Sequence, residues 1–168
     1  LDALLADRVI RPALNEHQDE IELWRFHRRA RRDEAGHQFS FIFFASPAAA
    51  QQIYRHIQAN ATLKMMQSSG LIDRVGYEST DRITKPDVED TSDPNWSPAI
   101  QKSWPYFIMG VSQAWLDWID QATHNNMTNS STTVAQPSLG PSLEDIFPLP
   151  ERSWATWRGR PAASRPYQ

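Results

Sequence analysis

The chain has 168 residues, a formal net charge of −3 and no cysteine, and it contains seven Trp and seven Phe. This length fits one domain, and the aromatic side chains suffice for a sizeable core. The lack of cysteine excludes a disulfide scaffold, a thiolate metal site and a cysteine nucleophile. The weak negative charge gives no overall attraction to nucleic acid or anionic membranes. No apolar run reaches the roughly 20 residues that span a bilayer.

The N-terminal part of the chain predicts a helix followed by a β-hairpin. Residues 1–17 have the apolar spacing of an amphipathic helix, and Pro12 is expected to kink it or restart it near Ile10. Residues 20–30 and 37–45 then alternate between polar and apolar side chains, on either side of a connection with turn-forming Asp and Gly. Two alternating runs around such a turn predict a pair of antiparallel strands.

The two predicted strands separate aromatic from basic side chains. The residues expected to bury their rings in the core are Trp24, Phe26, Phe39, Phe41 and Phe43. The opposite side of the first strand carries Arg25, His27 and Arg29, within a run that has five arginines and no acid between residues 24 and 32. The sequence therefore predicts a hairpin with one core side and one strongly basic side.

The middle of the chain predicts two further helices and a third strand. Ser46, which is followed by proline, is typical of a helix N-terminus, and this helix is expected to end at Asn60. A short helix over 62–69 is expected to stop at Gly70. The alternating residues of 71–80 then predict a strand.

An acidic loop over 80–96 leads to a long helix, which is expected to run from Ser97 to about Ala122. Pro105 within it predicts a kink or a break at Trp104. The apolar residues at helical spacing are Trp104, Phe107, Ile108, Val111, Trp115, Leu116, Trp118 and Ile119. We interpret this stripe as part of the core, and a ligand pocket or a partner surface is the alternative.

The composition changes after this helix. Residues 124–142 contain no Asp, Glu, Lys or Arg and predict a flexible linker, and 143–168 form an extension rich in Pro, Trp and Arg. This extension is expected to pack on its own domain or on a neighbour. We expect one α+β domain over 1–123, with a ferredoxin-like or related antiparallel sheet and helices on one face. Three strands are clear, and a fourth is expected from 80–90 or from the C-terminal stretch.

Within the stretch VIRPALNEHQDEIELWRFHRRARRDEAGHQFSFIFF, a helix is followed by an aromatic strand that ends in Arg and by a Gly-His turn into a second strand. The residues that carry this pattern are Trp24, Phe26, Arg28, Gly36 and His37. The pattern resembles the C-terminal domain of lanthipeptide and thiopeptide dehydratases. In that family such residues contact a modified peptide, so the resemblance implies peptide binding by Arg28 and His37. The second strand departs from the family pattern, because no arginine follows His37 in it.

The sequence lacks the patterns that are typical of other kinds of active site. His27 and His37 flank the hairpin turn and are placed to face each other, but the histidines have none of the short metal-binding spacings, so no metal is predicted. Ser40 lies in mid-strand rather than on a nucleophile turn, and Glu89 and Asp90 lie in a polar loop. The few glycines form no phosphate-binding motif, so no cofactor and no catalytic residue are predicted.

The basic side of the hairpin is the candidate site. We select Arg25, His27, Arg28, Arg29 and His37 as candidate ligand-binding residues, because rows of arginine hold phosphate, carboxylate or RNA. The alternative is a solvated sheet face whose arginines pair with the acidic residues of 81–93.

These observations predict a non-enzymatic binding or scaffold domain that uses the arginine-rich hairpin to hold a protein or peptide, with a homodimer as a further expectation. Two alternatives stay open: an accessory component of a dehydratase-like, peptide-modifying pathway, and a nucleic-acid-binding protein. The sequence begins without Met, so cytoplasmic and periplasmic locations are both expected, the latter with a lipid anchor if an upstream leader was removed.

Overall fold

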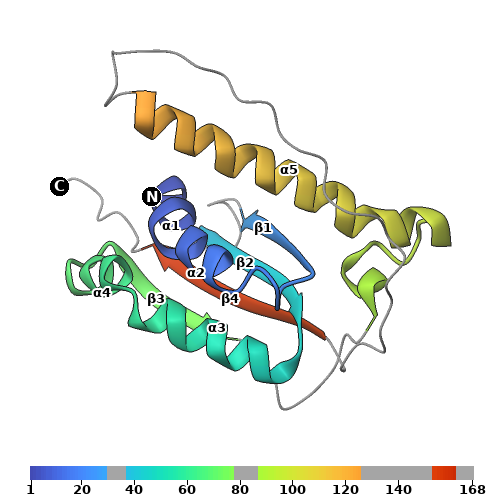
Figure 1. Ribbon diagram of the computed structural model, residues 1–168, viewed down its shortest axis with the longest axis horizontal. Coiled ribbons are helices and arrows are strands. Elements are labelled where there is room, and N and C mark those ends of the chain that lie inside the picture. The colour runs from blue at the N-terminus through green and yellow to red at the C-terminus, as the bar shows by residue number, and fades with distance from the viewer. Residues whose placement is uncertain (30–36, 78–86, 126–152, 162–168) are drawn as a thin grey trace.

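The computed structural model describes residues 1–29, 37–77, 87–125 and 153–161. They form a four-stranded antiparallel sheet with helices packed against it, which confirms the predicted α+β class (Figure 1). The strands are β1 (Leu23–Arg29), β2 (Gln38–Ala45), β3 (Ile72–Tyr77) and β4 (Ser153–Pro161). Their order is β1-β2-β4-β3, so the C-terminal strand lies inside the sheet.

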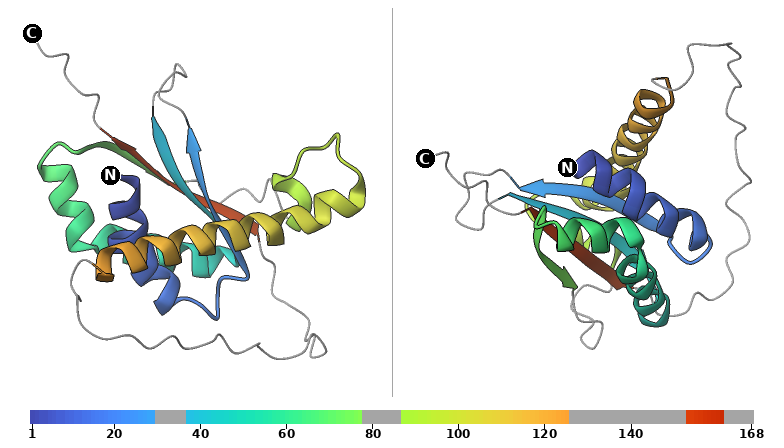
Figure 2. Two further views of the ribbon diagram at one scale, coloured as in Figure 1. Left: turned by 90° about the horizontal axis from the view of Figure 1, so that it is seen from above. Right: turned by 90° about the vertical axis from the view of Figure 1, so that its left-hand side faces the viewer.

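Most of the helices cover one face of the sheet, whereas Val88 and Met109 pack against Leu23, Ile42 and Phe44 on the other face. The helical elements are α1 (Asp2–Leu5), the π-helical turn η1 (Ala6–Ile10), α2 (Arg11–Glu16), α3 (Pro47–Ala59), α4 (Ala61–Ser68), the 3-10 helix η2 (Val88–Thr91) and α5 (Pro98–Asn125). Elements α1 to α4 lie on the same face, and α5 runs along the β1 edge (Figure 1 and Figure 2). No helix within the described ranges is long and apolar enough to cross a membrane.

The core between the sheet and the helices is dominated by aromatic rings from the inner strands. Phe39, Phe41 and Phe43 are fully buried. Phe41 pairs with Phe26 on one side and with Trp157 on the other, so three neighbouring strands each contribute a ring. The aromatic side of the hairpin is therefore packed as the sequence predicts, with large rings supplying most of the buried apolar surface.

Strand β4 comes from the segment that the sequence analysis assigns to a C-terminal extension. Its Trp157 is fully buried, and a Cβ added to Gly159 would come within 2.8 Å of the Trp157 ring. Glycine at this position therefore lets the indole lie against the strand. Of the two expected sources of a fourth strand, the C-terminal stretch supplies it. The predicted linker falls outside the described residues from 126 onward.

Short sequence signals set the helix ends as predicted. The Ser46 hydroxyl accepts a hydrogen bond from the Ala49 N–H at 3.2 Å at the start of α3. Asn60 ends α3 and caps α4, because its side-chain oxygen accepts from the Leu63 N–H at 3.1 Å. Gly70 follows α4 with a φ of 71°, a left-handed conformation that glycine adopts without strain.

The N-terminal helix is irregular just before its proline. Ala6–Ile10 forms a single π-helical turn, and α2 then begins at Arg11 with Pro12 in its first turn. Proline lacks the N–H that a helix interior requires, whereas the first turn leaves that position unbonded in any case. The backbone stays in the right-handed helical conformation through Ile10 and Arg11, so the irregularity expected near Ile10 is a π-helical turn rather than a restart of the helix.

The helix α5 closes the β1 edge of the sheet. The Phe26 N–H donates to the Ser112 hydroxyl at 3.1 Å, and this hydroxyl donates to the Ile108 carbonyl at 2.8 Å. The ring of Trp115 packs edge-on against that of Phe26, with centroids 5.3 Å apart. An edge covered in this way is no longer a template for pairing with another strand.

The helix α5 continues through Pro105 without a break, although the sequence predicts a kink or a break at Trp104. Proline removes the N–H that would bond to the Gln101 carbonyl, four residues earlier. The Ser92 hydroxyl donates to that carbonyl at 2.7 Å instead. A residue from the preceding loop thus satisfies the group that Pro105 leaves without its helical partner.

Only part of the predicted core stripe of α5 is buried. Leu116 and Ile119 lie in the core, whereas Phe107, Val111 and Trp118 are 62%, 47% and 64% exposed. The core prediction is therefore wrong for these three residues. The apolar residues of α5 are spread over more of its circumference than the contact with the sheet covers, so the helix presents a second apolar stripe away from it.

Candidate anion-binding face

The candidate site lies on the sheet face that points away from α1 to α4. Because side chains alternate along β1, Arg25, His27 and Arg29 point away from the aromatic core. His27 pairs with Ser40 on β2, which pairs with Arg158 on β4. We call the group Arg25, His27, Arg29 and Arg158 the basic face. Arg25 is half-buried, and the other three side chains are exposed.

The charges on the basic face all have one sign. The other described residues on this side of β1, β2 and β4 are Leu23, Gln38, Ser40, Ile42, Phe44 and Thr156, none of which is acidic. No ion pair joins Arg25, His27 or Arg29 to a carboxylate within the ranges that the structure describes. The expected alternative partners are the acidic residues of 81–93, of which 81–86 lie outside those ranges.

Burial lowers the pKa of two residues of the basic face, His27 and Arg25. The pKa of His27 is lowered from its ordinary value, first by burial and then by the charges of Arg25, Arg29 and Arg158. Burial also lowers the pKa of Arg25, whose buried Nε has no hydrogen-bond partner among the described residues. An anion among these groups would accept hydrogen bonds and offset the repulsion between them.

Arg28 and His37 lie on the other side of the hairpin, around Asp2. The Asp2 side chain is buried, with its carboxylate 2.5 Å from the Arg28 Nε, and it accepts a hydrogen bond from the His37 Nε2 at 2.9 Å. Arg28 balances this buried charge, and the contacts of Arg28 and His37 with Asp2 connect α1 to the hairpin. The five candidate residues are thus divided between two faces, and the expectation that His27 and His37 face each other is wrong.

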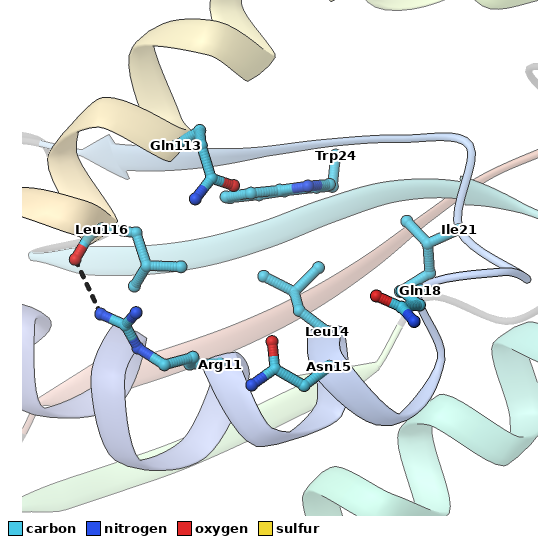
Figure 3. Close-up of a pocket in the computed structure, with 8 residues that line it drawn as sticks. All are labelled: Arg11, Leu14, Asn15, Gln18, Ile21, Trp24, Gln113 and Leu116. Atoms are coloured by element: carbon cyan, nitrogen blue, oxygen red, sulfur yellow. Dashed lines mark hydrogen bonds between the residues drawn. The ribbon is translucent and has the colours of Figure 1, made fainter. Parts of the chain in front are cut away.

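A small pocket lies between α2, the segment that follows it, β1 and α5 (Figure 3). It has a volume of about 200 Å³ and is lined by Arg11, Leu14, Asn15, Gln18, Ile21, Trp24, Gln113 and Leu116. Arg11 donates to the Leu116 carbonyl at 2.7 Å and pairs with Asp7 at 3.0 Å, so its charge is already balanced. Ligand pockets usually hold about 300–1,000 Å³, so we do not assign this pocket as the site.

Three residues of the basic face, Arg25, His27 and Arg29, are predictable from the sequence, whereas the fourth, Arg158, is not. Arg158 belongs to a segment far along the chain, and only the pairing of β4 with β2 brings it beside His27. No local signal predicts that pairing. Within the described parts of the chain, no group of three or more His, Asp or Glu side chains is arranged to hold a metal ion.

Comparisons with known proteins add no family to these observations. No family model, no curated protein and no solved structure matches the chain. The geometry and charge of the basic face are therefore the observations on which a functional proposal depends.

Proposed function

We propose that this chain is a non-enzymatic binding module that holds an anionic group of a protein or peptide partner on its basic face. The observation that carries the proposal is the clustering of Arg25, His27 and Arg29 with Arg158 on one side of β1, β2 and β4, whose described residues include no Asp or Glu on that side. Like charges held this close repel each other, and a bound anion relieves that repulsion.

The chemistry of the basic face suits phosphate and carboxylate groups. A guanidinium group presents planar donors that match both groups in a bidentate manner. The guanidinium group of Arg25 is already partly desolvated, because its Nε is enclosed by the protein. The exposed His27 supplies a further hydrogen-bond donor, and a nearby anion favours its protonated form.

The shape of the basic face favours an extended partner. Small ligands bury most of their surface in concave pockets, and the pocket described above is lined by other residues. Arg25, His27 and Arg29 are spaced two residues apart along β1, which corresponds to roughly 6.5 Å between successive side chains. A peptide with an anionic residue at every second position matches this spacing.

Calorimetric titration with three peptides of equal length tests the proposal: one with Glu at alternate positions, one with phosphoserine there and one with Gln. We expect the first two to bind and the Gln peptide not to bind. Arg25→Ala and Arg29→Ala should each weaken binding about 10- to 100-fold, since a hydrogen bond to a charged group contributes roughly 1.5–3 kcal/mol. Arg55→Ala is the matched control, because Arg55 is exposed on α3, on the other side of the sheet.

The comparison between the Glu and phosphoserine peptides identifies the preferred anion. Equal binding of the Gln peptide, or an equal loss with Arg55→Ala, would contradict the proposal. Tighter binding of single-stranded RNA than of either peptide, with a steep loss of affinity as salt increases, would assign the basic face to nucleic acid instead.

A further inference from the structure

The second apolar stripe of α5 has the spacing of a coiled-coil seam. It consists of Ile100, Trp104, Phe107, Val111, Ala114 and Trp118, which recur at alternating intervals of four and three residues. We call this set the α5 stripe. None of its residues is charged, and Phe107 and Trp118 are each more than 60% exposed. The stripe is adjacent to the residues that pack on the sheet, so the sheet contact does not account for it.

We propose that the α5 stripe binds the same stripe of a second copy of this chain in antiparallel orientation, forming a two-fold symmetric homodimer. The stripe is self-complementary about position 109. Pairing about that point sets Ile100 against Trp118, Trp104 against Ala114 and Phe107 against Val111 of the second copy. Each layer combines a larger with a smaller side chain, which is the arrangement that interdigitated packing favours.

Gly110 lies beside the centre of the α5 stripe. A Cβ added to Gly110 would meet no heavy atom within 4 Å, so packing within the chain does not require glycine there. Apart from proline, glycine is the least favourable residue in a helix interior. In the antiparallel pair, Gly110 of the two copies would flank the two-fold axis, where the absence of a side chain lets the two backbones approach closely.

The helix dipoles favour an antiparallel second copy over a parallel one. In the antiparallel pair the dipoles of the two α5 helices oppose each other, whereas in a parallel pair their like ends lie together. Antiparallel pairing about position 109 also sets Asp117 level with the uncharged Gln101 of the second copy. No like charges therefore oppose each other at these positions.

The exposed area is sufficient for a reversible dimer. Because a large aromatic side chain contributes about 150–250 Å², the exposed parts of the α5 stripe amount to roughly 500 Å² per copy. A pair then buries on the order of 1,000 Å², which is at the lower end of specific interfaces. We therefore expect a dimer whose population rises with protein concentration.

Sedimentation equilibrium of the full chain over a range of concentrations tests the dimer. The mass should rise from 19.3 kDa towards twice that value. Phe107→Glu should weaken association at least about 100-fold, because it buries an unpaired charge. Tyr106→Glu is the matched control, since Tyr106 is 53% exposed but lies off the stripe, and it should leave association unchanged. Gly110→Ala should raise the melting temperature of the monomer and weaken association.

Cross-linking tests the orientation, because the chain has no cysteine and each variant introduces a single thiol. Val111→Cys lies near the proposed axis, so the thiols of its two copies are only about 6 Å apart along the helices. The two thiols of a Gln121→Cys dimer would be roughly 36 Å apart along the helices. A short bismaleimide should link only the Val111→Cys dimer. A chain that stays at 19.3 kDa at every concentration, as expected if its own residues 126–152 cover the stripe, overturns the proposal. Equal linking of both variants overturns the antiparallel orientation.

Discussion

At the scale of single residues, adjacent arginines on β1 have different environments. Arg28 points to the helix-covered side and contacts the buried carboxylate of Asp2. Arg29 points to the basic face, where no described residue is acidic. The strand geometry alone causes this difference, because successive side chains point to opposite faces. Residue type is therefore a poor guide to function here, and the side of the sheet decides which arginines are available to a partner.

His27 should make folding stability depend on pH. Its folded-state pKa is below the ordinary value of 6.5, so the unfolded chain takes up the proton first as the pH falls. The resulting loss of stability should be absent above about pH 7.5 and should develop as the pH falls through 6.5 towards the folded-state pKa. Urea unfolding of the wild type and His27→Gln at pH 8 and pH 5.5 measures it. An identical pH dependence in both proteins would contradict the prediction.

At the scale of elements, the two faces of α5 have different roles. One face covers the β1 edge through Ser112, Trp115 and Leu116, and the other carries the exposed α5 stripe. Among the described residues, the Ser112 hydroxyl provides the hydrogen bond in this edge contact, because it accepts from the Phe26 N–H and donates to the Ile108 carbonyl. Such a group links the helix to the sheet at a defined position along β1.

Replacing Ser112 with Ala should lower the free energy of unfolding by about 1–3 kcal/mol, because the Phe26 N–H loses its partner in a partly buried site. Hydrogen exchange of the Phe26 amide should become faster at the same time. Ser103→Ala is the control, since the exposed Ser103 hydroxyl bonds only to the Ile100 carbonyl of its own helix. Equal effects of both substitutions on stability and on Phe26 exchange would show that Ser112 does not hold the edge.

At the scale of the whole molecule, the C-terminal strand completes the sheet. Strand β4 lies between β2 and β3 and places Trp157 in the core, so the sheet cannot close without it. Hydrophobic contacts between β4 and both neighbours are thus made between segments far apart in the sequence. Folding that depends on such distant contacts carries a large loop-closure cost and is correspondingly slow.

A chain that ends at residue 152 should lack a cooperative unfolding transition, because β2 and β3 lose their shared neighbour and Phe39 loses its contact with the ring of Trp157. A chain that ends at residue 161 keeps β4 and is the matched control, which should unfold cooperatively. Urea titration followed by circular dichroism and tryptophan fluorescence distinguishes the two. Cooperative unfolding of the shorter chain would show that β4 is dispensable.

Local patterns in the sequence determine the hairpin, the helix ends and the side of the strand on which each arginine lies. Alternation along β1 and β2 predicts which rings are buried, because strand geometry requires nothing beyond neighbouring residues. The caps at Ser46 and Asn60 are equally local, since each bonds to an N–H three residues away. These parts of the fold and three members of the basic face are therefore predictable from the residues alone.

Tertiary structure decides the position of β4, the partner of each charged group and the exposure of α5. Arg158 joins the basic face, and Asp2 reaches Arg28, only because distant segments meet in one sheet and its helical layer. The apolar residues of α5 do not predict which face of this helix the sheet covers. The periodicity of apolar residues predicts the side of a helix or strand on which each residue lies. Whether that side is buried, and which charges pair there, depends on the other segments of the chain that pack against it.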